Sequence, residues 1–227
     1  MIFDPLYLLV IGVGFALALG AQMWVKSAVN RWSGVALGRG MTGADIAASI
    51  LAVEGIRDVG VEVVGGVLSD HYDPSTKTLR LSPANFHGRS IAAAGIAAHE
   101  VGHAIQHRDG YAPMKLRQAL VPVAGIGTNL GLWLAVIGMA VGVSGLASLG
   151  VALFGAFVLF TLVTLPVEID ASRRAKRALL AGGFVSREEG RGVSAVLDAA
   201  AATYLAAAVS AVLQLAYWVF RLGQSDE

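Results

Sequence analysis

Four long apolar segments dominate the pattern of hydrophobic and polar positions in this 227-residue chain. Each has about the twenty residues with which an α-helix crosses the hydrocarbon core of a membrane. Two of them are separated only by Ser144 and Gly145, which predicts a transmembrane hairpin. We therefore expect a mainly α-helical integral membrane protein with four transmembrane helices, at residues 6–25, 122–143, 146–167 and 199–220.

Two helices are predicted in the more polar stretch between the first and second spans. Thr42 and Asp45 have the spacing of a capping box, and the helix that they open would end at Gly55. Ser90 is a suitable N-cap for a second helix, which would run to about His107.

Three short strands are predicted between these two helices. Residues 59–64, 67–72 and 78–82 have the β-branched and alternating character of strands, and residues 73–77 form a turn between the last two. A hairpin therefore leads into the second helix, and this stretch predicts a small α+β domain.

The polar segment that follows the third span also contains residues typical of helix ends and helix starts. Gly182 and Gly183 would end one helix, and Ser186 with Glu189 forms a capping box for the next. The expected organisation is a first transmembrane helix (1–25), an α+β domain (26–121), a transmembrane hairpin (122–167), a helical segment (168–198) and a fourth transmembrane helix with a tail (199–227).

The distribution of basic residues predicts the orientation in the membrane. Ten Lys and Arg residues lie between residues 26 and 117, six lie between 173 and 191, and Arg221 alone follows the fourth span. Asp4 stands before the first span, where a cleavable signal would have basic residues. By the positive-inside rule we expect a multi-pass cell-membrane protein with both termini outside and the polar segments in the cytoplasm.

Composition supports a membrane protein and restricts its chemistry. Hydrophobic residues make up 56% of the chain, and the mean hydropathy is +0.65. The net charge of +1 gives no reason to expect nucleic acid as a partner. The chain has no cysteine, so any zinc site must be built from histidine and carboxylate ligands.

The segment from His99 to His103 matches the HExxH pattern and lies within the second predicted helix. Residues four apart share one helix face, so both histidines can bind one Zn²⁺ ion. Glu100 would lie beside the ion, where a carboxylate can take a proton from water. An ordinary polar helix face is the alternative, but the apolar residues 91–98 just upstream predict burial, and buried polar groups need partners.

A catalytic zinc ion usually has three protein ligands and one open position, so a third ligand must come from elsewhere. His107 lies on the same helix but turns away from the pair, and His71 and His87 belong to the hairpin region. Glu168, at the end of the third span, is the carboxylate candidate. Its position alone is equally typical of an interfacial residue at a membrane helix end.

The chain resembles the YugP family of membrane zinc metallopeptidases over nearly its whole length. The similarity lies in the apolar N-terminal helix and in three segments: Asp-His-Tyr-Asp-Pro at 70–74, Ala-His-Glu-Val-Gly-His-Ala-Ile-Gln-His at 98–107, and Leu-Pro-Val-Glu at 165–168. More distantly it is similar to HtpX-like and CAAX-processing membrane peptidases, which implies a zincin-like domain and peptide hydrolysis.

In those distant relatives the third ligand opens a Glu-x-x-Ala-Asp motif on a later helix. Glu168 and Ala171 fit that motif, so the resemblance implies Glu168 as the third ligand of one zinc ion per chain. Ser172 replaces the acid that would orient a zinc-bound imidazole, and Asp170 is a candidate substitute.

The same resemblance implies that Asp70 and His71 lie at an edge strand where an extended substrate binds. An edge strand has unpaired backbone groups for strand addition, and an imidazole can donate to a developing oxyanion. His71 is therefore a candidate catalytic residue, and a turn-stabilising role beside Asp70 and Asp73 is the alternative. His87 and His107 are expected at the surface or behind the ligands.

Together these features predict a membrane-embedded zinc endopeptidase that acts on peptide or membrane-protein substrates at the cytoplasmic face of the bilayer. A non-catalytic scaffold or assembly factor with a structural zinc site is one rival, and it would need a fourth protein ligand such as His107 or Asp170. Proteolysis within the bilayer is a second rival, which the polar stretch around HExxH disfavours. The oligomeric state does not follow from the sequence.

Overall fold

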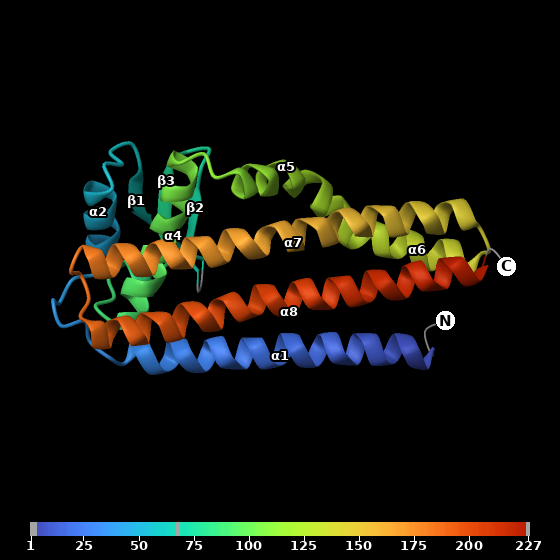
Figure 1. Cartoon of the computed structure of the whole chain (residues 1–227), viewed down its shortest axis with the longest axis horizontal. Coiled ribbons are helices and arrows are strands. Elements are labelled where there is room, and N and C mark those ends of the chain that lie inside the picture. Colours follow the sequence, from blue (N-terminus) through green and yellow to red (C-terminus); the bar gives the residue numbers. More distant parts are fainter. Residues whose placement is uncertain (1–3, 67–68, 226–227) are drawn as a thin grey trace. The chain divides into compact units, whose positions relative to one another are not determined.

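The computed structural model describes residues 4–66 and 69–225, which divide between two compact units. The first unit comprises Met1–Gln22, Ala112–Pro166 and Thr203–Glu227, and the second comprises Met23–Tyr111 and Val167–Ala202. Three long helices contribute residues to both units (Figure 1): α1 (Pro5–Ser33), α7 (Ser144–Ala181) and α8 (Arg187–Ser225).

Helices are the only regular secondary structure in the described residues of the first unit. Besides parts of the three long helices it contains α5 (Ala112–Ile126), the π-helix η1 (Gly127–Gly131) and α6 (Leu132–Ala140). Its buried core is apolar and aromatic, and Phe154, Val158 and Trp218 are among its members.

Glycines allow α6 and α7 to pack closely within the first unit. A Cβ at Gly138 would meet the backbone of Ala147, and a Cβ at Gly150 would meet the backbone of Ala135. Small residues at such contacts are how membrane helices associate, because apolar burial gives little driving force in lipid. Helices α6 and α7 are therefore a close antiparallel pair, and the transmembrane hairpin stays a prediction.

Three helices of the described chain are long and apolar enough to cross a membrane: Pro5–Ser33, Ser144–Ala181 and Arg187–Gln224. They contain the predicted spans at 6–25, 146–167 and 199–220. The predicted span at 122–143 instead runs through the end of α5, η1 and α6. Pro122 lacks an N–H group and η1 interrupts the α-helical hydrogen bonding, so no single long helix forms there. A fourth crossing stays a prediction.

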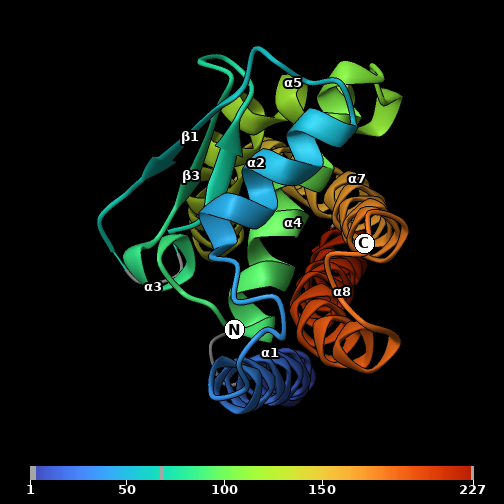
Figure 2. The ribbon, with the colours of Figure 1, turned by 90° about the vertical axis from the view of Figure 1, so that its left-hand side faces the viewer.

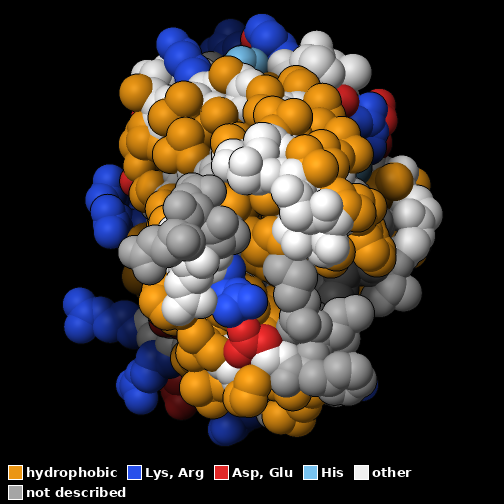
Figure 3. Space-filling model, turned by 90° about the vertical axis from the view of Figure 1, so that its right-hand side faces the viewer, with side chains coloured by type: hydrophobic (Ala, Val, Ile, Leu, Met, Phe, Trp, Pro, Cys, Tyr) orange, Lys and Arg blue, Asp and Glu red, His pale blue; other side chains and the backbone are white. Residues whose placement is uncertain are grey.

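Apolar side chains point outward along the candidate spans. Leu8, Leu9 and Phe15 of α1 are all more than half exposed, at 53%, 63% and 67%. Hydrophobic side chains also cover much of the surface in Figure 3. Large exposed apolar surfaces are costly in water, so these faces fit a lipid environment.

The second unit contains a three-stranded sheet and, among its described residues, three helices of its own, α2, α3 and α4. Figure 2 shows these helices beside the sheet. Its elements are α2 (Gly43–Val53), β1 (Gly60–Val63), β2 (His71–Asp73), β3 (Thr78–Leu81), the short α3 (Pro83–Phe86) and α4 (Ile91–Arg108). The strand order is β1-β3-β2, with β1 parallel and β2 antiparallel to β3. Both β1 and β2 are therefore edge strands.

The predicted helix caps of the second unit are confirmed. Thr42 and Asp45 form both hydrogen bonds of a capping box at the start of α2. The Ser90 hydroxyl accepts from the Ala93 N–H at the start of α4, which ends at Arg108, one residue beyond the prediction. Each cap satisfies N–H groups that have no partner within the helix.

The strand prediction is partly wrong. Residues 67 and 68 lie outside the described residues, and β2 begins only at His71 and extends to Asp73. Asp70 is therefore not part of the edge strand. The reason is local, because the Asp70 carboxylate accepts hydrogen bonds from Ser82 and Asn85 and so holds the chain at the start of α3. The predicted hairpin between 72 and 79 is confirmed.

Candidate metal centre

Helix α4 carries the HExxH segment through the interior of the second unit. Alanines and glycines fill most of its first three turns, so neighbouring backbones approach closely and the helix is buried along most of its length. His99 and His103 project from one face, with ring centroids 4.8 Å apart. The predicted sharing of a helix face is confirmed.

Glu168, from α7, completes a group of three candidate ligands with the two histidines. Its Oε2 atom lies 3.1 Å from Nε2 of His99 and 3.5 Å from Nε2 of His103. Ligands held 2.0–2.2 Å from a tetrahedral Zn²⁺ ion lie about 3.3–3.6 Å apart. The two distances lie at or slightly below this range, and all three ligand atoms lie within 4.8 Å of one another, so the three side chains could hold a zinc ion after small adjustments. They are the one such group in the described part of the chain.

The other ring nitrogen of each histidine faces away from Glu168. Nδ1 of His99 lies 3.1 Å from the Ser172 hydroxyl, and Nδ1 of His103 lies 3.1 Å from Oε1 of Gln106. Both Nε2 atoms are thus directed to the same point. Partners on the outer nitrogen are usual for zinc-bound imidazoles, because they fix the orientation of the ring.

A close approach of α4 and α7 brings the ligands together. A Cβ at Gly102 would collide with the carbonyl group of Ala171, whose Cα lies 3.1 Å from that position. Only glycine therefore allows this contact. Because Ala171 lies between Glu168 and Ser172, the contact places both of their side chains opposite the histidines.

The electrostatics of the group favour positive charge. Glu168 is 2% exposed, so its carboxylate is almost removed from water. Burial lowers the pKa of His103, but the hydrogen bond and charge of Glu168 outweigh it, and the pKa lies above its usual value. The negative charge of Glu168 that raises this pKa would also attract a metal cation.

Glu100 lies beside the ligand group and is not one of its members. It follows His99 directly on α4, about 100° further around the helix axis. The side chain is buried, with 8% of the residue exposed. This is the position expected for a carboxylate that handles a proton next to the metal.

Asp70 and His71 are held by contacts of their own. The Asp70 carboxylate is engaged with Ser82 and Asn85, as described above. Nδ1 of His71 lies 2.7 Å from the backbone carbonyl of Ser69, and its side chain is exposed on edge strand β2. The ligand group does not include His71, and its predicted role in catalysis stays a prediction.

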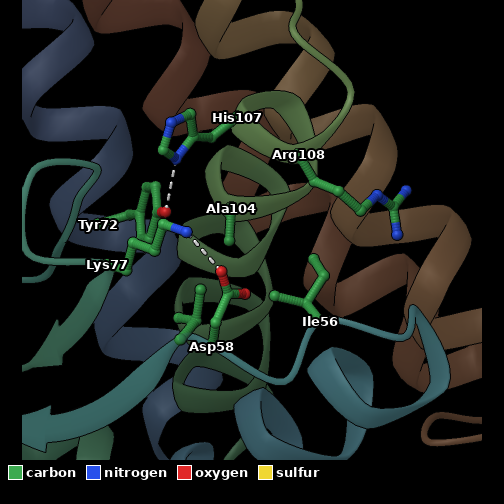
Figure 4. A pocket seen from close by; sticks show the side chains of 8 residues that line it. Ile56, Asp58, Tyr72, Lys77, Ala104, His107 and Arg108 are labelled. Atoms are coloured by element: carbon green, nitrogen blue, oxygen red, sulfur yellow. Dashed lines mark hydrogen bonds and ion pairs between the residues drawn. The ribbon is translucent and has the colours of Figure 1, made fainter.

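His107 takes part in a separate contact between α4 and β2. Burial and the charges of Asp58 and Asp73 raise the pKa of Tyr72 to about 12. Its hydroxyl forms a hydrogen bond with Nδ1 of His107 at 2.8 Å. Figure 4 shows this pair beside a hollow of about 270 Å³, with the Lys77–Asp58 ion pair on the same side. His107 therefore supports the domain and is not directed at the ligands.

Sequence reasoning missed three residues that shape the centre: Gly102, Gln106 and Arg174. Arg174 donates to Asp170 and Asp109 and lies over the ring of Tyr111. The spacing of Gln106 three residues after His103 was a usable signal, since such residues are neighbours on a helix. Arg174 had a similar signal, since it lies four residues after Asp170, but its contact with Asp109, 65 residues away, had none. Gly102 gave no signal, because its partner Ala171 is 69 residues away in the sequence.

Comparison with known proteins agrees with this geometry. Residues 7–223 match a family model described as "Putative neutral zinc metallopeptidase". The chain is 44% identical over 206 residues to "Putative membrane protease YugP" of Bacillus subtilis (strain 168), a match that covers 89% of this chain and 92% of that protein. No solved structure matches. With a histidine, histidine and glutamate group suited to zinc and a match over almost its full length, the chain belongs to this zinc metallopeptidase family.

Proposed function

We propose that this protein is a membrane-embedded, zinc-dependent endopeptidase that hydrolyses peptide bonds at the cytoplasmic face of the membrane. The observation that carries the proposal is the convergence of Glu168 on the two histidines of an HExxH helix. Glu100 follows the first of these histidines directly in the sequence. A pair of histidines on one helix is common, but a buried carboxylate aimed at both of them has little purpose without a cation.

His99, His103 and Glu168 would hold the ion. When bound, Zn²⁺ supplies Lewis acidity, which polarises the scissile carbonyl and lowers the pKa of water. Glu100 accepts the proton of the attacking water and passes it to the leaving amine. Ser172 and Gln106 hold the imidazoles in place during these steps.

The contacts of two other residues argue against a purely structural zinc site. Such a site closes all four positions with protein ligands, and His107 and Asp170 were the candidates for the fourth. His107 is engaged by Tyr72, and Asp170 is engaged by Gln106 and Arg174. Among the described residues the group contains three ligands, which leaves one position for water and substrate.

Edge strand β2 is the proposed site for an extended peptide. It lies at the end of the strand order and packs on α4, so a substrate could add to it as a further strand. We place exposed His71 next to the bound peptide, where it donates to the oxyanion, whereas Asp70 positions this strand through Ser82 and Asn85.

The proposed location rests on the charge distribution and the candidate spans. Sixteen of the 17 Lys and Arg residues lie in the segments that we place in the cytoplasm, and both termini would lie outside. Membrane proteins and their cytoplasmic tails are then the peptides that the site meets most often. A role in membrane-protein quality control follows as the proposed context.

The test is the Glu100→Gln variant of the full chain in detergent, with zinc content and cleavage of an unstructured reporter protein measured together. We expect one zinc per chain to be retained and cleavage to fall by about 10²- to 10⁴-fold, because general base catalysis is lost while the ligands remain. Cleavage by purified Glu100→Gln at the wild-type rate would exclude this mechanism.

A further inference from the structure

Gln106 is a fully buried amide behind the candidate metal centre, with 0% of the residue exposed. All its polar atoms have partners. Oε1 lies 3.1 Å from Nδ1 of His103, while Nε2 donates to the Val167 carbonyl at 2.8 Å and to the Asp170 carboxylate at 2.9 Å.

These partners fix the orientation of the amide. A carbonyl oxygen and a carboxylate only accept hydrogen bonds, so the NH₂ group must face Val167 and Asp170. The reversed amide would place Oε1 against two acceptors and leave them without a donor in a buried site. Oε1 therefore faces His103, and because that oxygen only accepts, Nδ1 of His103 must carry hydrogen.

A charged residue behind Asp170, Arg174, helps to hold the Gln106 amide in this orientation. Nε of Arg174 donates to the same Asp170 oxygen at 2.6 Å, and its Nη1 donates to Asp109, the C-cap of α4, at 2.5 Å. These contacts tie the end of α4 to α7, and the same Asp170 oxygen accepts from both Gln106 and Arg174. Asp170 thus helps to fix the orientation of the Gln106 amide, and that amide in turn faces Nδ1 of His103.

We propose that Gln106 is a positioning residue that holds His103 in the tautomer with hydrogen on Nδ1 and leaves Nε2 free to bind the ion. The inference rests on the proposed zinc site and adds the residue that prepares one of its ligands. His99 differs, because its partner Ser172 has a hydroxyl that can donate or accept and so imposes no tautomer.

The direct test compares wild type with Gln106→Met, which keeps the length of the side chain and removes the amide. Zinc affinity of the full chain in detergent is measured by competition with a chelator. We expect it to fall about 10- to 100-fold, the effect typical of lost outer partners of metal ligands. In nitrogen-15 spectra of histidine-labelled, zinc-loaded protein, the wild type should show a protected Nδ1–H signal from His103, and the Gln106→Met variant should lack it.

A double variant separates tautomer control from packing. In Gln106→Glu/Asp170→Asn the new carboxylate still accepts from Nδ1–H, and the new amide can donate to it. We expect this variant to recover the Nδ1–H signal and to bind zinc more tightly than Gln106→Met. Ser90→Ala is the matched control, since it weakens the start of α4 away from the centre and should leave zinc affinity unchanged.

The outcomes distinguish this inference from the proposed function. If wild type binds no zinc, the proposed metal site itself is wrong. If wild type binds zinc and folded Gln106→Met binds it equally well with the same Nδ1–H signal, Gln106 has no positioning role, whatever the activity.

Discussion

The two units of the molecule use different kinds of contact. In the first unit the core is apolar, with side chains such as Phe154, Val158 and Trp218, and glycines at the contact of α6 and α7. In the second unit a buried polar network joins α4 to α7 through His99, His103 and Glu168 and continues to the residues behind them.

This difference indicates how each unit should respond to substitution. Apolar packing is the sum of many weak contacts, so one change is absorbed partly by its neighbours. In a buried polar network each lost group leaves another without a partner in a medium of low polarity. Changes in the polar network of the second unit should therefore weaken a specific property, zinc binding, whereas changes in the first unit should alter stability alone.

The largest effect is expected for Glu168→Ala. Loss of a ligand should weaken zinc binding by more than the roughly 100-fold that loss of an outer partner causes. Glu62→Ala is the control, because Glu62 is an exposed carboxylate of the same unit that forms only a loose ion pair with Arg80. Zinc content after dialysis against a chelator checks both. Full zinc occupancy in Glu168→Ala at wild-type affinity would remove Glu168 from the site.

Gly102→Ala should have the next largest effect. Alanine favours a helix over glycine by about 1 kcal/mol, but here its methyl group meets the Ala171 backbone, and overpacking costs about 1–3 kcal/mol. The displaced α7 would carry Glu168 away, so zinc affinity and thermal stability should fall together.

Gly125→Ala in α5 is the matched comparison from the first unit. Nothing lies within 4 Å of a Cβ at that position, so zinc affinity should be unchanged and stability equal or higher. If Gly102→Ala behaves in the same way as Gly125→Ala, the close contact of α4 and α7 does not position the ligands.

The smallest effect is expected for Tyr217→Phe in the first unit. The Tyr217 hydroxyl donates to Asp4 at 3.0 Å, and its removal leaves the ring packing intact. We expect Tm in detergent to fall by at most about 2–4 °C, the shift that one hydrogen bond gives in a chain of this size. Zinc affinity should not change. A loss of zinc in this variant would show that the polar network is not confined to the second unit.

Features set by neighbouring residues could be predicted from the sequence. The capping box at Thr42, the N-cap at Ser90 and the pairing of His99 with His103 depend on spacings of three or four residues, and all three are confirmed. Three of the four apolar runs likewise lie in long helices as predicted, because length and hydropathy suffice for them.

Features set by distant residues could not be predicted in this way. The parallel pairing of β1 with β3 skips the intervening strand, and no local pattern specifies it. Glu168 was supplied by family resemblance, since its position alone was equally typical of a membrane interface. The role of Ser172 as the partner of His99 appears only when α4 and α7 are brought together.

X-ray absorption at the zinc edge of the purified, full-length protein tests the central claim most directly. The account predicts one zinc per chain, four-coordinate, with two imidazole nitrogens and two oxygens at about 2.0–2.2 Å, one oxygen from Glu168 and one from water. A protein without zinc after growth in zinc-replete medium, or an ion bound by three or more imidazoles, would contradict it.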